Sequence, residues 1–134
     1  MNLEEHIVTL PTDDLERAYA FYKALGLQLA RNPDSDVLPE PLEFRLTSAS
    51  VLMFAPRDGF AFAAASNEVA PHGTSECVQS MVMGSKSEVD ALIEKARSAG
   101  AAIVTEPSQQ FMGYASVFKD LDGHLWVVVC VRQG

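Results

Sequence analysis

Histidine, cysteine and carboxylate side chains are the groups in this chain that could hold a metal ion or act in catalysis. The three histidines, His6, His72 and His124, show no i, i+2 or i, i+4 spacing that would place two of them on one face of an element. Cys77 and Cys130 lie in apolar, strand-like segments without a Cys-x-x-Cys motif, so we expect two buried, reduced thiols. The sequence has no Ser-His-Asp order, phosphate loop or nucleotide fingerprint. These residue types therefore indicate no particular reaction, and we assign no catalytic residue.

The first element that would position such groups is a strand followed by a helix. Residues 7–10 are strand formers, and we expect Pro11 to end the strand. Asp13 is the expected N-cap of the helix, with Glu16 three residues later as in a capping box. Apolar side chains then recur at helical spacing, at Leu15, Ala18, Tyr22 and Leu25. Gly26 is expected to end the helix in a left-handed conformation.

The same pattern returns in the second half of the chain. A strand candidate at 77–83 precedes a second possible capping box at Ser85 and Glu88, and Gly100 ends this helix as Gly26 ends the first. The apolar positions of the second helix are Val89, Leu92, Ile93 and Ala96. Strand candidates follow the first helix at 27–31, 42–47 and 51–55, and the second at 101–105, 113–119 and 124–131. Each half therefore predicts a β-α-β-β-β module.

The predicted fold class is α+β, with both modules in one domain spanning residues 1–134. The first module is 1–56, a connecting segment is 57–73, and the second module is 74–134. One helix covers only one face of a sheet, so we expect a curved mixed sheet with helices outside and a cleft inside. The connecting segment contains an apolar run, Phe60 to Ala65, which is either a functional cover or a linker packed on a core edge.

Two stretches resemble the vicinal oxygen chelate superfamily, which contains glyoxalases, bleomycin resistance proteins and extradiol dioxygenases. "TLPTDDLERAYAFYKALGL" (9–27) is similar to the opening strand and helix of that family. "SVFKDLDGHLWVVV" (116–129) is similar to its closing hairpin, with Leu121 where the family has proline. The resemblance covers nearly the whole chain and implies a homodimer. It is specific for the fold and says little about the reaction, because one fold hosts many functions.

The resemblance also implies positions for a divalent metal that chelates two substrate oxygens. These positions are occupied by Ile7, Val127, and Val78 or Gln79, none of which is a strong metal ligand. We therefore expect no cofactor and no metal of the usual type. His6 is one residue away from the first position and should point to the opposite face, unless a β-bulge turns it inward.

The candidate ligand-pocket residues come from strand parity and from side-chain chemistry. Glu5 shares the parity of Ile7 and Thr9 and is either an acceptor for a ligand amine, a general base, or a solvated strand end. Tyr114 and Ser116 share one face of a strand, where they either offer hydroxyls to a ligand or follow ordinary sheet alternation. Met53, Phe60 and Phe62 either line an apolar pocket or belong to the core. The full set of candidates is Glu5, Ile7, Thr9, Met53, Phe60, Gln79, Tyr114, Ser116 and Val127.

Charge and composition limit the partners. The chain has 134 residues, 48% of them hydrophobic, and a net charge of -8, which argues against nucleic acid and anionic membranes as partners. No secretory signal is recognisable, so we expect a cytoplasmic protein. The resulting hypothesis is a metal-free protein that binds a small molecule. Two alternatives stay open: a glyoxalase-like lyase or a dioxygenase with a non-standard metal site that includes His6, and a structural or regulatory dimer.

Overall fold

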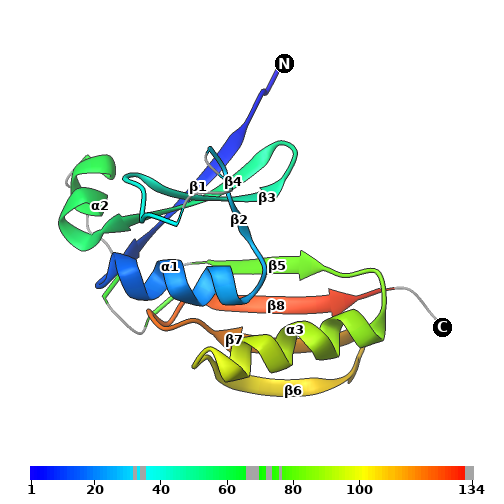
Figure 1. The fold of residues 1–134 in the computed structure, drawn as a ribbon. Coiled ribbons are helices and arrows are strands. Elements are labelled where there is room, and N and C mark those ends of the chain that lie inside the picture. The colour runs from blue at the N-terminus through cyan, green and yellow to red at the C-terminus, as the bar shows by residue number, and fades with distance from the viewer. Residues whose placement is uncertain (32, 34–35, 66–69, 72–73, 76, 132–134) are drawn as a thin grey trace. The chain divides into compact units, whose positions relative to one another are not determined.

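The computed structural model describes residues 1–31, 33, 36–65, 70–71, 74–75 and 77–131, without the side chains of residues 61–63. It divides into two compact units, Met1–Val69 and Ala70–Gly134, each built around its own sheet (Figure 1). The units are described one at a time.

The first unit contains four strands and two helices. They are β1 (His6–Thr12), α1 (Leu15–Ala24), β2 (Gln28–Leu29), β3 (Leu42–Thr47), β4 (Ser50–Pro56) and α2 (Arg57–Ala63). The strand order is β1-β4-β3-β2, with β1 parallel to β4 and the other neighbours antiparallel. The strand predictions at 42–47 and 51–55 are therefore confirmed to within a residue, and α2 is a helix that the sequence reading did not predict.

The first strand and helix differ from expectation at two residues. Pro11 lies inside β1, so the prediction that it ends the strand is wrong. Because β1 is an edge strand, a residue without an N–H can be accommodated there. The N-cap of α1 is Asp14, whose side chain accepts a hydrogen bond from the Arg17 N–H, and not Asp13, which instead pairs with Arg57. Gly26 has a φ of 101°, as predicted for the residue that closes the helix.

The core of the first unit lies between α1 and one face of its sheet. Tyr22 of α1 is 1% exposed, and its ring packs against Phe44 of β3 and Phe54 of β4 at centroid distances of 5.8 and 4.9 Å. Leu42 and Leu52 on the same face are fully buried. Burying side chains of this size stabilises a fold by about 1.5–3 kcal/mol each, so this face is fixed against the helix.

The second unit repeats the arrangement. Its elements are β5 (Val78–Val82), α3 (Lys86–Ser98), β6 (Ala102–Gln110), β7 (Gly113–Lys119) and β8 (Leu125–Cys130). The strand order is β5-β8-β7-β6, again with the first and last strands of the unit parallel. Ser85 is the N-cap of α3, as predicted, and its hydroxyl accepts a hydrogen bond from the Glu88 N–H. β6 is longer than the predicted 101–105 strand.

The core of the second unit lies between α3 and one face of its sheet. Trp126 of β8 is 1% exposed and stacks on Phe118 of β7 with centroids 6.4 Å apart. Val89 and Ile93 of α3 are fully buried. Cys130 is buried, as predicted, but Cys77 is exposed because it lies just before β5 and outside the packed face.

The predicted fold class, α+β with two β-α-β-β-β modules, is confirmed. The cleft predicted between the modules stays a prediction. None of the helices in the described residues is long and apolar enough to cross a membrane.

Candidate functional site

The face of the first sheet opposite α1 carries several of the predicted pocket residues. Two rows of paired residues cross it, Ile7–Val51–Arg45 and Thr9–Met53–Glu43. We call these six residues the site face. Thr9 and Met53 touch directly, with the threonine hydroxyl 3.8 Å from the methionine sulfur. Strand parity predicted that Ile7 and Thr9 share a face, and the pairing of β1 with β4 places Met53 beside Thr9 on that face.

Charged side chains at this face form a four-residue ion network, made of Glu5, Arg31, Glu43 and Arg45. Nη1 of Arg45 donates to Oε2 of Glu5 at 2.9 Å, and Nη2 of Arg31 lies 3.5 Å from the other oxygen of Glu5. Nε of Arg31 lies 2.8 Å from Oε2 of Glu43. The side chain of Glu43 is 6% exposed, whereas that of Arg31 is 59% exposed, so a buried carboxylate is paired with a largely exposed guanidinium.

The ion network determines what Glu5 can do chemically. The hydrogen bond from Arg45 and the positive charges of Arg45 and Arg31 lower the pKa of Glu5. A carboxylate with a lowered pKa stays ionised at neutral pH and is a weaker base. The arrangement therefore favours an electrostatic role for Glu5 over general-base catalysis.

Sequence reasoning missed Glu43, Arg31 and Arg45. The signal for two of them was present in β3, where Glu43 and Arg45 alternate with apolar residues in the stretch "LEFRL" (42–46). This alternation indicates a strand with one apolar face and one polar face. The partner Arg31 lies in an irregular segment after β2, where strand parity gives no information.

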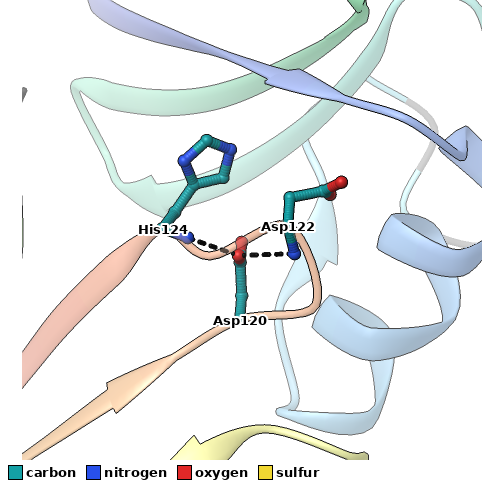
Figure 2. A group of neighbouring side chains, drawn as sticks. All are labelled: Asp120, Asp122 and His124. Carbon is teal, nitrogen blue, oxygen red and sulfur yellow. Dashed lines mark hydrogen bonds between the residues drawn. The ribbon is translucent and has the colours of Figure 1, made fainter. Parts of the chain in front are cut away.

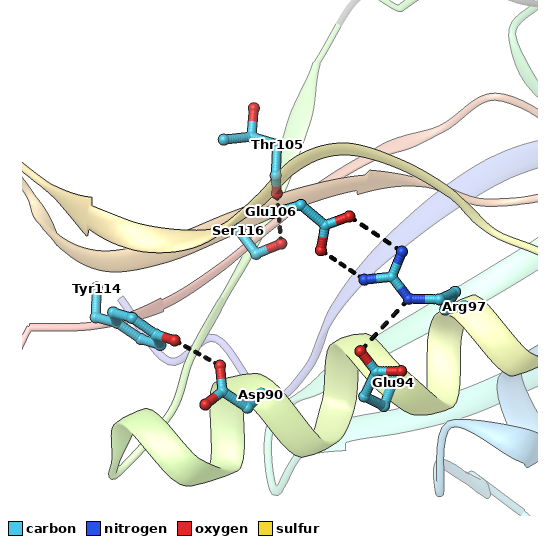
Figure 3. A network of polar contacts seen from close by, with 7 residues as sticks. All are labelled: Asp90, Glu94, Arg97, Thr105, Glu106, Tyr114 and Ser116. Carbon is cyan, nitrogen blue, oxygen red and sulfur yellow. Dashed lines mark hydrogen bonds and ion pairs between the residues drawn. The ribbon is translucent and has the colours of Figure 1, made fainter.

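The predicted residues Tyr114 and Ser116 lie on the α3 side of the second sheet (Figure 3). The Tyr114 hydroxyl donates to Oδ1 of Asp90 on α3 at 2.6 Å, and this hydrogen bond raises the pKa of Tyr114. The Ser116 hydroxyl donates to the backbone oxygen of Thr105 at 2.7 Å and is fully buried. Both hydroxyls are engaged within the unit, so we do not include these residues in the candidate site.

Gln79 and Val127 lie on opposite faces of the second sheet. Gln79 is paired with Trp126 and therefore shares the face that packs on α3. Its amide donates to Sγ of Cys77 at 3.5 Å. Val127 is paired with Ser80 of β5, so it lies on the face opposite α3. Val127 stays a candidate pocket residue, and Gln79 does not.

The positions that the resemblance assigns to metal ligands carry side chains without donor atoms. Ile7 lies on the site face and Val127 on the face opposite α3, and both are hydrocarbons. The third position is either Val78 or Gln79. Of these two residues, Val78 lies on the same face as Val127, and its side chain is also a hydrocarbon. His6 is exposed and has the opposite parity to Ile7, and its backbone N–H donates to the backbone oxygen of Ala49 at 2.8 Å. These side chains do not fit a divalent metal site of the usual type.

A second group of potential metal ligands lies in the loop between β7 and β8 (Figure 2). One ligand atom from each of Asp120, Asp122 and His124 lies within 4.8 Å of the others. However, Oδ1 of Asp120 accepts the backbone N–H groups of Asp122 and His124 at 3.0 and 2.8 Å. These bonds hold the turn, which contains Gly123 at a φ of 89°. We therefore interpret the group as turn structure.

The remaining predicted residues lie in the connecting segment, 57–73. Phe60 is half-buried in α2. The Phe62 side chain and His72 lie outside the described residues. The helix that contains Phe60, α2, contacts β1 and β4.

An exposed ion pair connects α3 to β6 in the second unit (Figure 3). The guanidinium of Arg97 binds both carboxylate oxygens of Glu106, through Nη1 at 3.0 Å and Nη2 at 2.5 Å. The hydrogen bonds from Arg97 lower the pKa of Glu106. This pair is structural and lies on the α3 side of the sheet.

Comparisons with known proteins identify one matching family and several similar solved structures. The family model described as Glyoxalase/Bleomycin resistance protein/Dioxygenase superfamily matches residues 5–128. A hypothetical protein from S. aureus is 28% identical with a TM-score of 0.79, over 97% of this chain and 94% of that one. A glyoxalase/bleomycin resistance protein/dioxygenase family enzyme from Burkholderia phytofirmans is 20% identical with a TM-score of 0.75, over 98% and 100% of the two chains.

A third solved structure is that of TnmS3, an antibiotic binding protein from a Streptomyces species. It is 19% identical with a TM-score of 0.65, over 94% of this chain and 93% of that one. At such identities, the likeness to the Burkholderia and Streptomyces proteins shows the fold alone. A comparison with curated proteins found no match.

Proposed function

The chain belongs to the Glyoxalase/Bleomycin resistance protein/Dioxygenase superfamily, and on that premise we propose that it is a metal-free small-molecule-binding protein. In this proposal the ligand contacts the site face of the first unit. In this proposal the fold serves to bind a ligand and not to carry out metal-assisted chemistry. TnmS3, whose fold is similar, is an antibiotic binding protein, which makes a binding function compatible with the fold.

The observation that carries the proposal is the composition of the site face. It combines the accessible apolar side chains of Ile7 and Met53, and the fully buried Val51, with the charged groups of Glu43 and Arg45. Sites for small molecules typically have this combination, in which apolar residues supply contact area and a few polar groups fix orientation. Thr9 and Met53 are partly accessible, so a ligand could reach the centre of the face.

The metal-free part of the proposal rests on the side chains at the positions that the resemblance assigns to metal ligands. A divalent ion needs several oxygen or nitrogen ligands, whereas the family positions offer the hydrocarbons Ile7, Val127 and Val78. The carboxylates of the ion network, Glu5 and Glu43, are paired with arginines. An arginine beside a carboxylate opposes the binding of a second cation by charge repulsion.

Two measurements on untagged protein test the proposal. A thermal-shift screen of small molecules should find ligands that raise the melting temperature of the wild type, and Met53→Glu should abolish the shift by placing an unpaired charge on the site face. Glu16→Gln, on the exposed side of α1, should keep it. Elemental analysis should find less than about a tenth of an equivalent of zinc, nickel, manganese or iron. A stoichiometric metal, or the absence of any stabilising ligand, would contradict the proposal.

We also propose that the protein is a homodimer, because the resemblance to the superfamily implies one. Light scattering coupled to size exclusion would measure the mass in solution directly. A mass equal to that of one 14.5 kDa chain would contradict this proposal without affecting the site face.

A further inference from the structure

We infer that Glu43 forms a subsite for a cationic group of the ligand, an ammonium or a guanidinium, and that Arg31 occupies this subsite when no ligand is bound. The inference rests on the proposed function, because it assigns a ligand class to the same site face. The Arg31 guanidinium stands in for the cation of the ligand.

The first support is the burial of Glu43. It lies on β3 opposite Met53, and the whole residue is 5% exposed. An ionised carboxylate removed from water is strongly destabilised unless a cation compensates it. Among the described residues, Glu43 forms an ion pair with Arg31. The position therefore favours a cation over any neutral or anionic group.

The second support is that this pairing is incomplete. Nε of Arg31 is 2.8 Å from Oε2 of Glu43, but its N–H is not directed at that oxygen, so the contact is a charge contact without an aligned hydrogen bond. Oε2 is shielded from solvent and accepts no hydrogen bond within the described part of the chain. Buried acceptors are nearly always satisfied, and Arg–carboxylate pairs are usually bidentate. An N–H donor from a ligand would complete the bonding of this oxygen.

The third support is that the Arg31 side chain can move away from Glu43 when a ligand binds. Its side chain is 59% exposed and also contacts Glu5 at 3.5 Å. The residue before it, Ala30, is fixed by its backbone N–H, which donates to the backbone oxygen of Glu43 at 2.9 Å. The cation of the ligand would replace the Arg31 guanidinium, so the buried Glu43 carboxylate would not be left unpaired, and Arg31 can keep its contact with Glu5.

The neighbouring residues suggest what the rest of the ligand is like. Met53 lies directly beside Glu43 on the sheet, and Thr9 touches Met53. A ligand whose cation reaches Glu43 would rest its carbon body on these side chains. The ligand class is therefore a small molecule with an apolar body and one ammonium or guanidinium group.

The test compares two probes that share an apolar body, naphthylmethylammonium and naphthalenemethanol, by isothermal titration calorimetry. We expect the wild type to bind the ammonium about tenfold or more tightly than the alcohol, because a charged hydrogen bond contributes about 1.5–3 kcal/mol. Glu43→Gln should bring the ammonium to the affinity of the alcohol and leave the alcohol unchanged. Arg31→Gln should tighten the ammonium severalfold, because it removes the competing cation.

Glu16→Gln makes the same change of charge as Glu43→Gln on the exposed side of α1, and it should leave both affinities within about twofold. Circular dichroism would verify that each variant folds. If Glu43→Gln does not fold, the wild-type affinities for the two probes decide the question, because equal affinities refute the inference.

Several results would overturn the inference. Equal affinity of the wild type for both probes would refute it while the protein remains a small-molecule binder. Weaker binding of the ammonium to Arg31→Gln would show that Arg31 contacts the ligand and does not stand in for it. Failure of both probes alongside hits in the thermal-shift screen would refute the inference alone, and failure of both probes and the screen would refute the proposed function as well.

Discussion

Removing the carboxylate of Asp120 should destabilise the second unit more than removing any exposed carboxylate. Asp120 is 6% exposed, and its Oδ1 accepts the backbone N–H groups of Asp122 and His124. Hydrogen bonds to a charged group contribute about 1.5–3 kcal/mol each, so Asp120→Ala should cost about 3–5 kcal/mol. Asp120→Asn keeps one acceptor oxygen and should cost about 1–2 kcal/mol. Glu94→Gln, in which a side chain that is 68% exposed changes, should stay within about 0.5 kcal/mol.

Urea unfolding followed by tryptophan fluorescence measures these differences. Trp126 is the only tryptophan, and it lies in β8 directly after the loop. Each curve should be repeated with EDTA, because a metal held by the Asp120 loop would also make Asp120→Ala destabilising. A cost below about 1 kcal/mol for Asp120→Ala, or a wild-type stability that falls on adding EDTA, would refute the interpretation of the loop as turn structure.

Two further predictions concern the second unit. Gly113→Ala should lower the free energy of unfolding by about 1–3 kcal/mol more than Gly100→Ala. Both glycines have positive φ, but a Cβ on Gly113 would lie 2.5 Å from the backbone oxygen of Cys130. A Cβ on Gly100 would lie 3.2 Å from the flexible side chain of Leu121. Equal costs in urea unfolding would contradict this. Because Arg97 lowers the pKa of Glu106, the pair stabilises the fold above the unfolded pKa of about 4.3, and this contribution is lost as the pH falls through the lower folded pKa. The difference in unfolding free energy between wild type and Arg97→Gln should therefore shrink between neutral and strongly acidic pH, and a difference that does not change with pH would refute the assignment.

Much of the fold could be predicted because its signals are local. Ser85, Gly26 and Gly100 each act within one turn of a helix, and the structure places all three as expected. The errors are also local. Asp13 and Asp14 are equally good caps by type, and only the hydrogen bond from the Arg17 N–H distinguishes them.

Strand parity predicted which residues of β1 share a face, whereas the ligand pocket itself stays a prediction. Ile7 and Thr9 were placed on one face by parity, and their pairing with β4 brings in Met53. For Tyr114 and Ser116 the same parity argument fits either face, and only the packing of α3 decides between them. The ion network depends on contacts between separate strands and loops, which alternation within a single strand does not reveal.

The parallel pairing of β1 with β4 has a consequence for the order of folding. The contact between Thr9 and Met53 joins residues 44 positions apart, whereas β3 and β4 are connected by a short turn. Closing a long loop costs more entropy than closing a hairpin, so we expect the β3–β4 hairpin to form early and β1 to dock late. Glu43 and Met53 would then be in place before Thr9 and Ile7 arrive. In this order of events the carboxylate of Glu43 is in place while its apolar neighbours on β1 are still missing, and the site face forms from the later strands back to the first.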